Sequence, residues 1–272
     1  MTDQAGKYER FLALHQGPAP LLMPNAWDRG SAALLASLGF EAIATTSSGF
    51  AATLGQLDNS VTRDQALEHA RTMAAAVSVP VSADLENCFA DDPAGVAETV
   101  QLAAGTGLAG CSVEDSTGRS DDPIYEPGLA AERVAAAVEA ARGPGSRLVL
   151  TARAENFLHG RPDLKDTIAR LQAYQAAGAD VLYAPGLTVL DDIRAVVSSV
   201  DRPVNVLTFA GTPDVTQLAG AGVRRISVGG AFAYAAYGAL ADAAKELREQ
   251  GSYGFLAAAR TGRGAVQAAF GD

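Results

Sequence analysis

The stretch VPVSADLENCFADDPAGVAETVQLAAGTGLAGCSVE, residues 79–114, decides the fold of this chain. It begins with a short apolar run at 79–84, continues through a polar loop into an Ala-rich segment at 93–106, and ends with a second apolar run at 110–114. Continuous apolar runs are typical of strands covered on both faces, whereas the longer middle segment has helical spacing. The stretch therefore predicts a β-α-β unit with two parallel strands.

The same unit recurs along the chain with no linker and no break in composition between copies. Eight short, largely apolar runs are expected to be strands: residues 21–24, 42–46, 79–84, 110–114, 148–152, 181–184, 204–208 and 225–228. A helix is expected after each of them: residues 31–38, 63–76, 93–106, 129–141, 164–177, 190–199, 213–219 and 231–249. Glycines just past several helices, such as Gly39 and Gly178, are typical helix ends.

Eight consecutive β/α units in a chain of this length indicate a (β/α)8 barrel of the TIM type. We therefore predict one α/β domain over residues 1–272. The alternative is an open doubly wound sheet, which normally carries a glycine-rich phosphate turn after its first strand. Here that turn reads PNAWD at 24–28 and does not match. Residues 251–272 follow the eighth unit, and their apolar positions predict extra C-terminal helices that pack on a partner subunit.

Composition limits the function. The 272 residues are 48% hydrophobic and 19% charged, as in a globular protein, and 31 acidic against 21 basic residues give a formal net charge of −10. This charge argues against nucleic acid and anionic membranes as partners. Only Cys88 and Cys111 occur, outside any disulfide or zinc pattern, and no export signal or membrane anchor is recognisable. We expect a cytoplasmic protein.

Ionisable residues gather where the predicted strands end, which is where TIM barrels carry their chemistry. The third strand ends in Asp84 and Glu86, and the fourth in Glu114. Alternation along the strand predicts that Asp84 and Glu86 point to the same side, with Glu114 at the corresponding level of the next strand. Crowded carboxylates favour a cation, and all-oxygen ligation suits Mg²⁺ or Mn²⁺. A ring of solvated charges with a salt bridge to Arg153 is the alternative.

Two further features lie at strand ends. Arg153, at the end of the fifth strand, is suited to a substrate carboxylate or phosphonate, although it could equally form a structural bridge to Glu114 or Glu155. The turn that contains Ser48 and Gly49 offers hydroxyl and backbone N–H donors, and Gly49 would let the chain approach a ligand closely. The three histidines are scattered and predict no Ser-His-Asp or Cys-His arrangement.

Taken together, these strand ends resemble those of the isocitrate lyase and phosphoenolpyruvate mutase superfamily, in its smaller and less characterised branch. The resemblance extends from Phe11 to about Leu247. Six segments carry it: LMPNAWD at 22–28, ATTSSG at 44–49, ADLE at 83–86, VED at 113–115, TAR at 151–153 and PVNV at 203–206. Each segment is short, and the combination makes the match specific.

The resemblance implies roles for individual residues. Asp84 resembles the direct Mg²⁺ ligand, with Glu86 and Glu114 holding metal-bound waters. The remaining site residues implied are Ser48 and Gly49 on the 2-oxo acid part of the substrate, Arg153 on its carboxylate, Asn205 at its distal end, and Asp58 as an acidic active-site residue. The family also implies a homotetramer that exchanges its last helix between subunits.

The resemblance further implies cleavage of a C–C or P–C bond beside a 2-oxo acid, through a pyruvate-like enolate. Isocitrate and methylisocitrate lyases carry a proton-donating Cys in the loop after the fourth strand, but here residues 116–123 read STGRSDDP. We therefore expect a Mg²⁺-dependent lyase that cleaves a C–C bond in a small 2-oxo or 2-hydroxy di- or tricarboxylic acid. P–C chemistry on phosphonopyruvate, or a non-catalytic protein that binds 2-oxo acids, are the alternatives.

Overall fold

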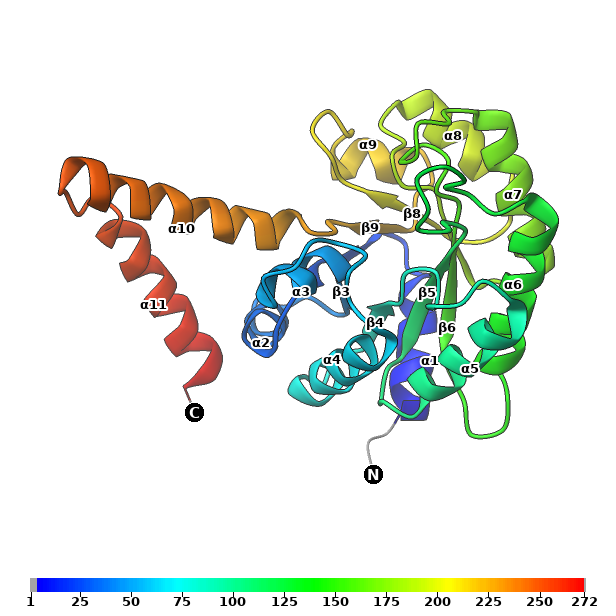
Figure 1. Ribbon diagram of the computed structural model, residues 1–272, viewed down its shortest axis with the longest axis horizontal. Helices are drawn as coiled ribbons and strands as arrows, with labels where there is room; N and C mark the ends of the chain where they lie inside the picture. The colour runs from blue at the N-terminus through cyan, green and yellow to red at the C-terminus, as the bar shows by residue number, and fades with distance from the viewer. Residues whose placement is uncertain (1–3, 272) are drawn as a thin grey trace.

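The computed structural model describes residues 4–271, so residues 1–3 and 272 of the predicted domain lie outside the described residues. Nine strands form one parallel sheet in the order β1-β9-β8-β7-β6-β5-β4-β3-β2 (Figure 1). Their bounds are β1 Leu21–Met23, β2 Asn25–Ala26, β3 Ile43–Thr45, β4 Val81–Asp84, β5 Gly110–Glu114, β6 Val149–Arg153, β7 Val181–Tyr183, β8 Val204–Leu207 and β9 Arg225–Ser227.

The two ends of this sheet are consecutive in the chain: β1 lies within the predicted strand at 21–24, and β2 lies just beyond it. β1 pairs with β9 and β2 pairs with β3, and only Pro24 separates β1 from β2. Proline has no N–H to donate to a ladder, so the strand divides there, although the Pro24 carbonyl still accepts from Ala44 N at 2.9 Å. β1 and β2 together therefore occupy one of eight strand positions around the barrel. The predicted TIM-type fold is confirmed.

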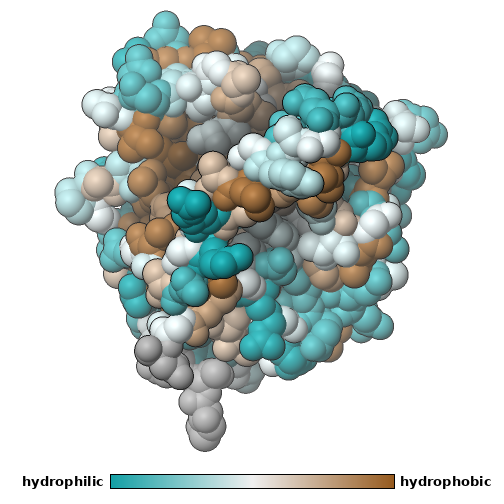
Figure 2. Space-filling view, turned by 90° about the vertical axis from the view of Figure 1, so that its left-hand side faces the viewer, coloured by the Kyte–Doolittle hydropathy of each residue, from teal (hydrophilic) through white to brown (hydrophobic). Residues whose placement is uncertain are grey.

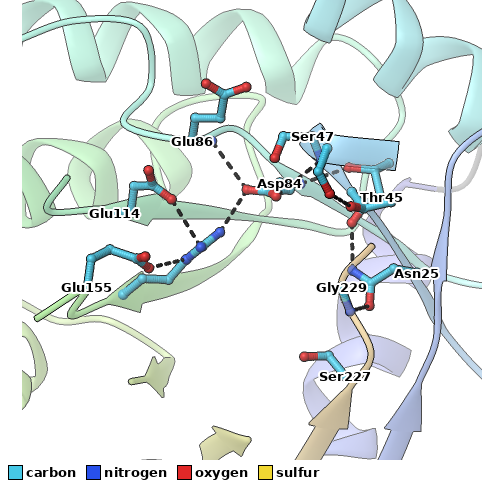
Figure 3. A network of polar contacts seen from close by, with 12 residues as sticks. Asn25, Thr45, Ser47, Asp84, Glu86, Glu114, Glu155, Ser227 and Gly229 are labelled. Carbon is cyan, nitrogen blue, oxygen red and sulfur yellow. Dashed lines mark hydrogen bonds and ion pairs between the residues drawn. The ribbon is translucent and has the colours of Figure 1, made fainter. Parts of the chain in front are cut away.

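The side chain of Asn25 stabilises the closure of the barrel from its interior. Its Nδ2 donates to the carbonyl of Thr45 on β3 at 2.7 Å, and its Oδ1 accepts from the N–H of Gly229, just after β9, at 2.9 Å (Figure 3). One side chain therefore bridges the strands on both sides of the split.

Helices alternate with the strands as expected, with three additions. Their bounds are α1 Gln4–Leu14, α2 Arg29–Ser37, α3 Ser47–Thr53, α4 Arg63–Ala76, α5 Pro93–Ala104, α6 Pro127–Ala141, α7 Leu164–Ala176, α8 Leu190–Ser198, α9 Val215–Gly220, α10 Ala231–Gln250 and α11 Leu256–Phe270. α1 and α3 were not expected from the sequence, and α11 forms within the predicted C-terminal extension.

Helix α1 closes one end of the barrel. Its Phe11 is fully buried in a cluster with Leu21 of β1, Val149 of β6 and Val181 of β7. These are residues at the amino ends of their strands, so α1 fills the end opposite to the strand termini that carry the polar groups. The barrel is therefore open to a ligand at its carboxyl end.

The last two helices leave the barrel. Figure 1 shows α10 extending away from the strands and α11 returning at an angle, with its end near α2. α11 packs on α2 of its own chain. Large apolar side chains of α10 and α11 nevertheless stay exposed to solvent, among them Leu240 of α10, at 64% exposure, and Leu247 of α10. Figure 2 views the molecule from this side and shows brown, hydrophobic areas on it. No helix within residues 4–271 is long and apolar enough to cross a membrane.

Candidate active site

A cavity of about 310 Å³ opens at the carboxyl ends of the strands. Its walls include five of the residues predicted from the sequence: Ser48, Asp58, Asp84, Arg153 and Asn205. Parallel strands bring these residues together although more than 150 positions separate the first from the last. The predicted location of the chemistry is therefore also where the structure has a suitably sized hollow.

Arg153 is the centre of the polar network. Its Nη1 lies 2.9 Å from Asp84 Oδ1, its Nη2 3.1 Å from Glu114 Oε2, and its Nε 2.8 Å from Glu155 Oε1. The guanidinium also lies over the ring of Tyr183, 5.1 Å from its centroid. The salt bridge to Glu114 that the sequence left as an alternative is thus present. The bridge to Glu155, the other partner in that alternative, is present as well.

Asp84 is hydrogen-bonded on two sides (Figure 3). On one side its Oδ1 accepts from Arg153 and from the backbone N–H of Glu86 at 3.3 Å. On the other side its Oδ2 accepts from the N–H of Ser47 at 3.3 Å, while the hydroxyl of Thr45 accepts from Asp84 N. The carboxylate is consequently held in one orientation, toward the cavity.

The relative placement of the carboxylates differs from the sequence prediction. β4 ends at Asp84, and Glu86 has a φ of 51°, so strand alternation does not extend to it. In the register of β4 and β5, Asp84 lies opposite Ser112, and the N–H of Glu114 donates to the carbonyl of Glu86. Glu114 therefore lies one side-chain layer beyond Asp84, because the partner strand continues after β4 has turned away.

The three predicted metal residues surround one rim without forming a ready set of direct ligands. Glu86 lines a small adjoining hollow, and Glu114 is held by Arg153. Across residues 4–271, no group of three or more His, Cys, Asp or Glu side chains is placed to hold a metal ion. Asp84 as a direct ligand, with Glu86 and Glu114 acting through water, stays a prediction.

Burial governs the protonation of the surrounding acids. Burial raises the pKa of the Glu86 carboxyl to about 8, and the charges of Asp84 and Asp58 add to this effect. Burial likewise raises the pKa of Glu114 well above its usual range, although Arg153 opposes the shift. Desolvation disfavours the charged form of a carboxyl group. The raised pKa values therefore indicate that the positive charge near this rim is too small to compensate all of its buried acids.

The segment that contains Ser48 and Gly49 is a helix start rather than a simple turn. Thr46 caps α3, and its Oγ1 lies 3.1 Å from Ser48 Oγ and accepts from Gly49 N at 3.4 Å. Ser48 lines the cavity. Gly49 does not: it is buried, and a side chain there would meet Trp27 and Ala233 of α10. Contact of Gly49 with a substrate stays a prediction.

Asp58 and Asn205 both line the cavity. Asp58 belongs to an exposed loop, but withdrawal of its carboxyl group from water raises its pKa, with Ser47 opposing through a hydrogen bond and Asp84 adding to the rise. Asn205, on β8, is buried, and its amide is engaged by Ser227 Oγ at 2.9 Å and by Arg225 Nε at 2.9 Å. Its direct contact with a substrate also stays a prediction.

A buried network behind the cavity holds Glu155 in place. Asp115 accepts from Glu155 N at 2.8 Å, from Arg170 Nη1 at 3.1 Å and from the hydroxyl of Tyr174 at 2.5 Å. Asp115 was part of the quoted VED segment but received no role from the sequence. The tertiary structure shows that Asp115 holds Glu155, which in turn pairs with Arg153.

Neither cysteine can supply the proton donor that the loop after β5 lacks. Cys88 and Cys111 are fully buried and are not among the cavity residues. Burial raises the pKa of the Cys88 thiol to about 12. The loop itself folds back on the antiparallel bridge between Ser116 and Ile124, with Arg119 held to Asp91 at 3.1 Å.

With this geometry established, comparison with known proteins assigns the chain to a family. It belongs to the phosphoenolpyruvate phosphomutase family, whose model matches residues 11–248. An uncharacterized protein of Mycobacterium tuberculosis (strain H37Rv) is 32% identical over 244 residues, 88% of this chain and 89% of that protein. The 2-methylisocitrate lyase of Escherichia coli (strain K12) is 30% identical over 204 residues, 71% of this chain and 68% of the enzyme.

Solved structures agree. A candidate lyase/mutase from Burkholderia cenocepacia is 54% identical, with a TM-score of 0.93 over 96% of this chain and 95% of that one. A 2,3-dimethylmalate lyase, described as a member of the phosphoenolpyruvate mutase/isocitrate lyase superfamily, is 26% identical, with a TM-score of 0.82 over 91% of this chain and 89% of that one. The expected superfamily is confirmed, and the protein is an enzyme of its lyase and mutase class.

Proposed function

We propose that this enzyme is a Mg²⁺-dependent lyase that cleaves a C–C bond in a small 2-oxo or 2-hydroxy di- or tricarboxylic acid. The observation that carries the proposal is the cavity at the carboxyl end of the barrel, with Asp84 and Arg153 at its rim. The similarity to 2-methylisocitrate lyase and 2,3-dimethylmalate lyase supports the same reaction class.

The residues at the rim fit a divalent cation. The carboxyl groups of Asp84, Glu114 and Glu155 contact Arg153, and those of Asp58 and Glu86 interact with the charge of Asp84, so a further cation at this rim would balance them. All these donors are oxygen atoms, which suits Mg²⁺, with Mn²⁺ as an alternative. When bound, such an ion supplies Lewis-acid stabilisation of negative charge that develops on the 2-oxo oxygen.

The chain's own side chains would orient the substrate. Arg153 presents a planar fork of donors next to Asp84, and a cation on Asp84 would free the Arg153 Nη1 that now pairs with it. That Nη1 could then hold the carboxylate of the 2-oxo acid. Ser48, at the first turn of α3, offers a hydroxyl from the opposite wall. Glu155 keeps the Arg153 side chain in position through its Nε.

Turnover assays test this proposal. The purified protein with Mg²⁺ is expected to cleave at least one acid among isocitrate, 2-methylisocitrate, 2,3-dimethylmalate and oxaloacetate. Asp84→Asn should lower kcat/KM by at least about 100-fold, since it removes the ligand charge. Asp191→Asn removes an exposed carboxylate on α8 and is the control. No turnover of any of these acids by the wild-type protein would contradict the proposal.

The family description favours one second candidate. Because the matching family is that of phosphoenolpyruvate phosphomutase, phosphonopyruvate is included in the assay, with release of phosphate or formation of phosphoenolpyruvate as the readout. Binding of pyruvate and Mg²⁺ without turnover of any substrate would instead support the non-catalytic 2-oxo acid binding protein.

We also propose that the enzyme is a cytoplasmic homotetramer in which the C-terminal helix is exchanged between subunits. Leu22 on β1 points outward and is 42% exposed, at a position that a closed barrel covers with a helix. The exposed apolar residues of α10 and α11 would cover such positions on a second copy of the chain. The two free cysteines, Cys88 and Cys111, are compatible with a reducing compartment.

A further inference from the structure

Arg225 lies deep inside the barrel, at the amino end of β9 and away from the strand ends that carry the acids. It is the first residue of β9, in register with Leu21 of β1 and Asn205 of β8. The residue is only 3% exposed, yet it is one of the residues that line the 310 Å³ cavity. A charged side chain at this depth needs an explanation, because arginine is almost never fully buried without a partner.

The groups that hold Arg225 are all neutral. Its Nε donates to Asn205 Oδ1 at 2.9 Å, and its Nη1 donates to Thr151 Oγ1 at 3.1 Å and lies 3.4 Å from His15 Nε2. His15 is uncharged: burial, and then the charge of Arg225, lower its pKa to about 3. These contacts fix the direction of the guanidinium but leave its charge uncompensated.

No acid within residues 4–271 forms an ion pair with Arg225. Its Nη2 has no hydrogen-bond acceptor among the described residues, although the Nη2 of Arg153 pairs with Glu114. Burial, and the positive charge of Arg153, lower the pKa of Arg225 to about 9, so the group is still charged at neutral pH. Arg225 therefore presents a free cationic donor to the cavity.

The cavity is consequently polarised along its depth. Asp58 and Asp84 lie at the rim, where the proposed cation would bind, and Arg225 lies at the other end. A molecule that matches this polarity chelates a cation at one end and carries an anionic group at the other. The volume of 310 Å³ corresponds to about ten water-sized groups, at roughly 30 Å³ each. This room suits an acid of four to six carbons.

We propose that Arg225 is the specificity-determining residue for a second carboxylate of the substrate, the one remote from the 2-oxo acid end, and that the enzyme therefore selects dicarboxylic over monocarboxylic acids. Asn205 is then a positioning residue, since its Oδ1 orients Arg225 and its Nδ2 is held by Ser227. The inference rests on the proposed function, because it takes the 2-oxo acid end to lie at Asp84.

Binding of two probes tests the inference without a turnover assay. Pyruvate and 2-oxoglutarate share the 2-oxo acid end, and only 2-oxoglutarate has a distal carboxylate. Isothermal titration calorimetry with Mg²⁺ should show that the wild-type protein binds 2-oxoglutarate more tightly than pyruvate. Arg225→Met should weaken 2-oxoglutarate binding by about 10- to 100-fold and change pyruvate binding by less than about threefold. Arg225→Lys should retain part of the preference.

Two controls keep the outcome interpretable. Arg224→Met removes the same charge from the neighbouring exposed position and should leave both affinities unchanged. Thermal unfolding checks that the Arg225→Met protein folds. If it does not fold, the inference is tested by the preference of the wild-type protein for 2-oxoglutarate over pyruvate and by the same comparison in the Arg225→Lys protein. Equal affinity of the wild-type protein for both probes, or equal losses for both probes in Arg225→Met, would overturn the inference. Failure of the wild-type protein to bind either probe would overturn the proposed function itself.

Discussion

Replacing Asp115 by Ala should unfold the protein at a markedly lower temperature, because this residue is the buried one of the two carboxylates that pair with Arg170. Asp115 is 3% exposed, and its carboxylate accepts from Arg170, from Tyr174 and from the N–H of Glu155. The substitution leaves Arg170 with only the partly exposed Asp166 as an ionic partner, and the Tyr174 hydroxyl without an acceptor. Removing one partner of a buried ion pair costs about 3–5 kcal/mol.

The expected shift in Tm follows from chain length. For a chain somewhat above 250 residues, 1 kcal/mol corresponds to about 2 °C, so Asp115→Ala should lower Tm by about 6–10 °C. The assay is thermal unfolding by circular dichroism at a fixed protein concentration, since assembly makes Tm depend on concentration. Asp115→Ala should also weaken ligand binding, because Glu155 then loses the contact that positions it beside Arg153.

Asp191→Ala is the matched control for Asp115→Ala. Asp191 pairs with Arg194 at 2.9 Å, as close as the buried pair, but its side chain is 86% exposed. An exposed pair contributes little, so the control should shift Tm by less than about 2 °C. If Asp115→Ala behaved like Asp191→Ala, the buried network would not stabilise the fold, and the reasoning would be refuted.

Two further predictions concern acid stability and assembly. His15 has a pKa of about 3 in the folded protein against 6.5 when unfolded, so the unfolded state takes up the proton first, and stability should fall by about 2 kcal/mol between pH 7 and pH 5. Denaturant unfolding at both pH values should show that His15→Gln lacks this contribution to the loss of stability. If the free energy of unfolding of His15→Gln fell between pH 7 and pH 5 as much as that of the wild-type protein, the pKa shift would be contradicted. Leu240→Glu, on the exposed face of α10, should reduce the mass measured by light scattering, whereas Leu102→Glu on the exposed face of α5 should not. A tetramer that survives Leu240→Glu would place the interface elsewhere.

Much of the site was predictable because strand ends can be recognised locally. The alternation of apolar runs and helical segments located the carboxyl ends of the strands, and Asp84, Glu114 and Arg153 follow directly from those positions. The positions of these side chains relative to one another along the barrel axis were not predictable. Glu86 leaves the strand alternation because its backbone adopts a φ of 51°, and no local pattern around it signals that turn.

Arg225 shows a different limit. A charged residue at the start of a predicted buried strand was a usable signal for Arg225, since such strands are otherwise largely apolar. That signal marks a buried charge without stating what compensates it. Whether Arg225 has an acidic partner depends on β6, β8 and α1, which lie far from it in the chain.

The sequence by itself determined the barrel, the edge of the barrel that carries the polar groups, and the superfamily, because apolar periodicity and strand-end residues are properties of short segments. Only the tertiary structure decided that Arg153 is shared among three carboxylates whereas Arg225 has none. It also decided that α10 leaves the barrel with its apolar side chains exposed. The physical reason is that charge balance and burial depend on neighbours from distant parts of the chain, which only the closed ring of strands brings together.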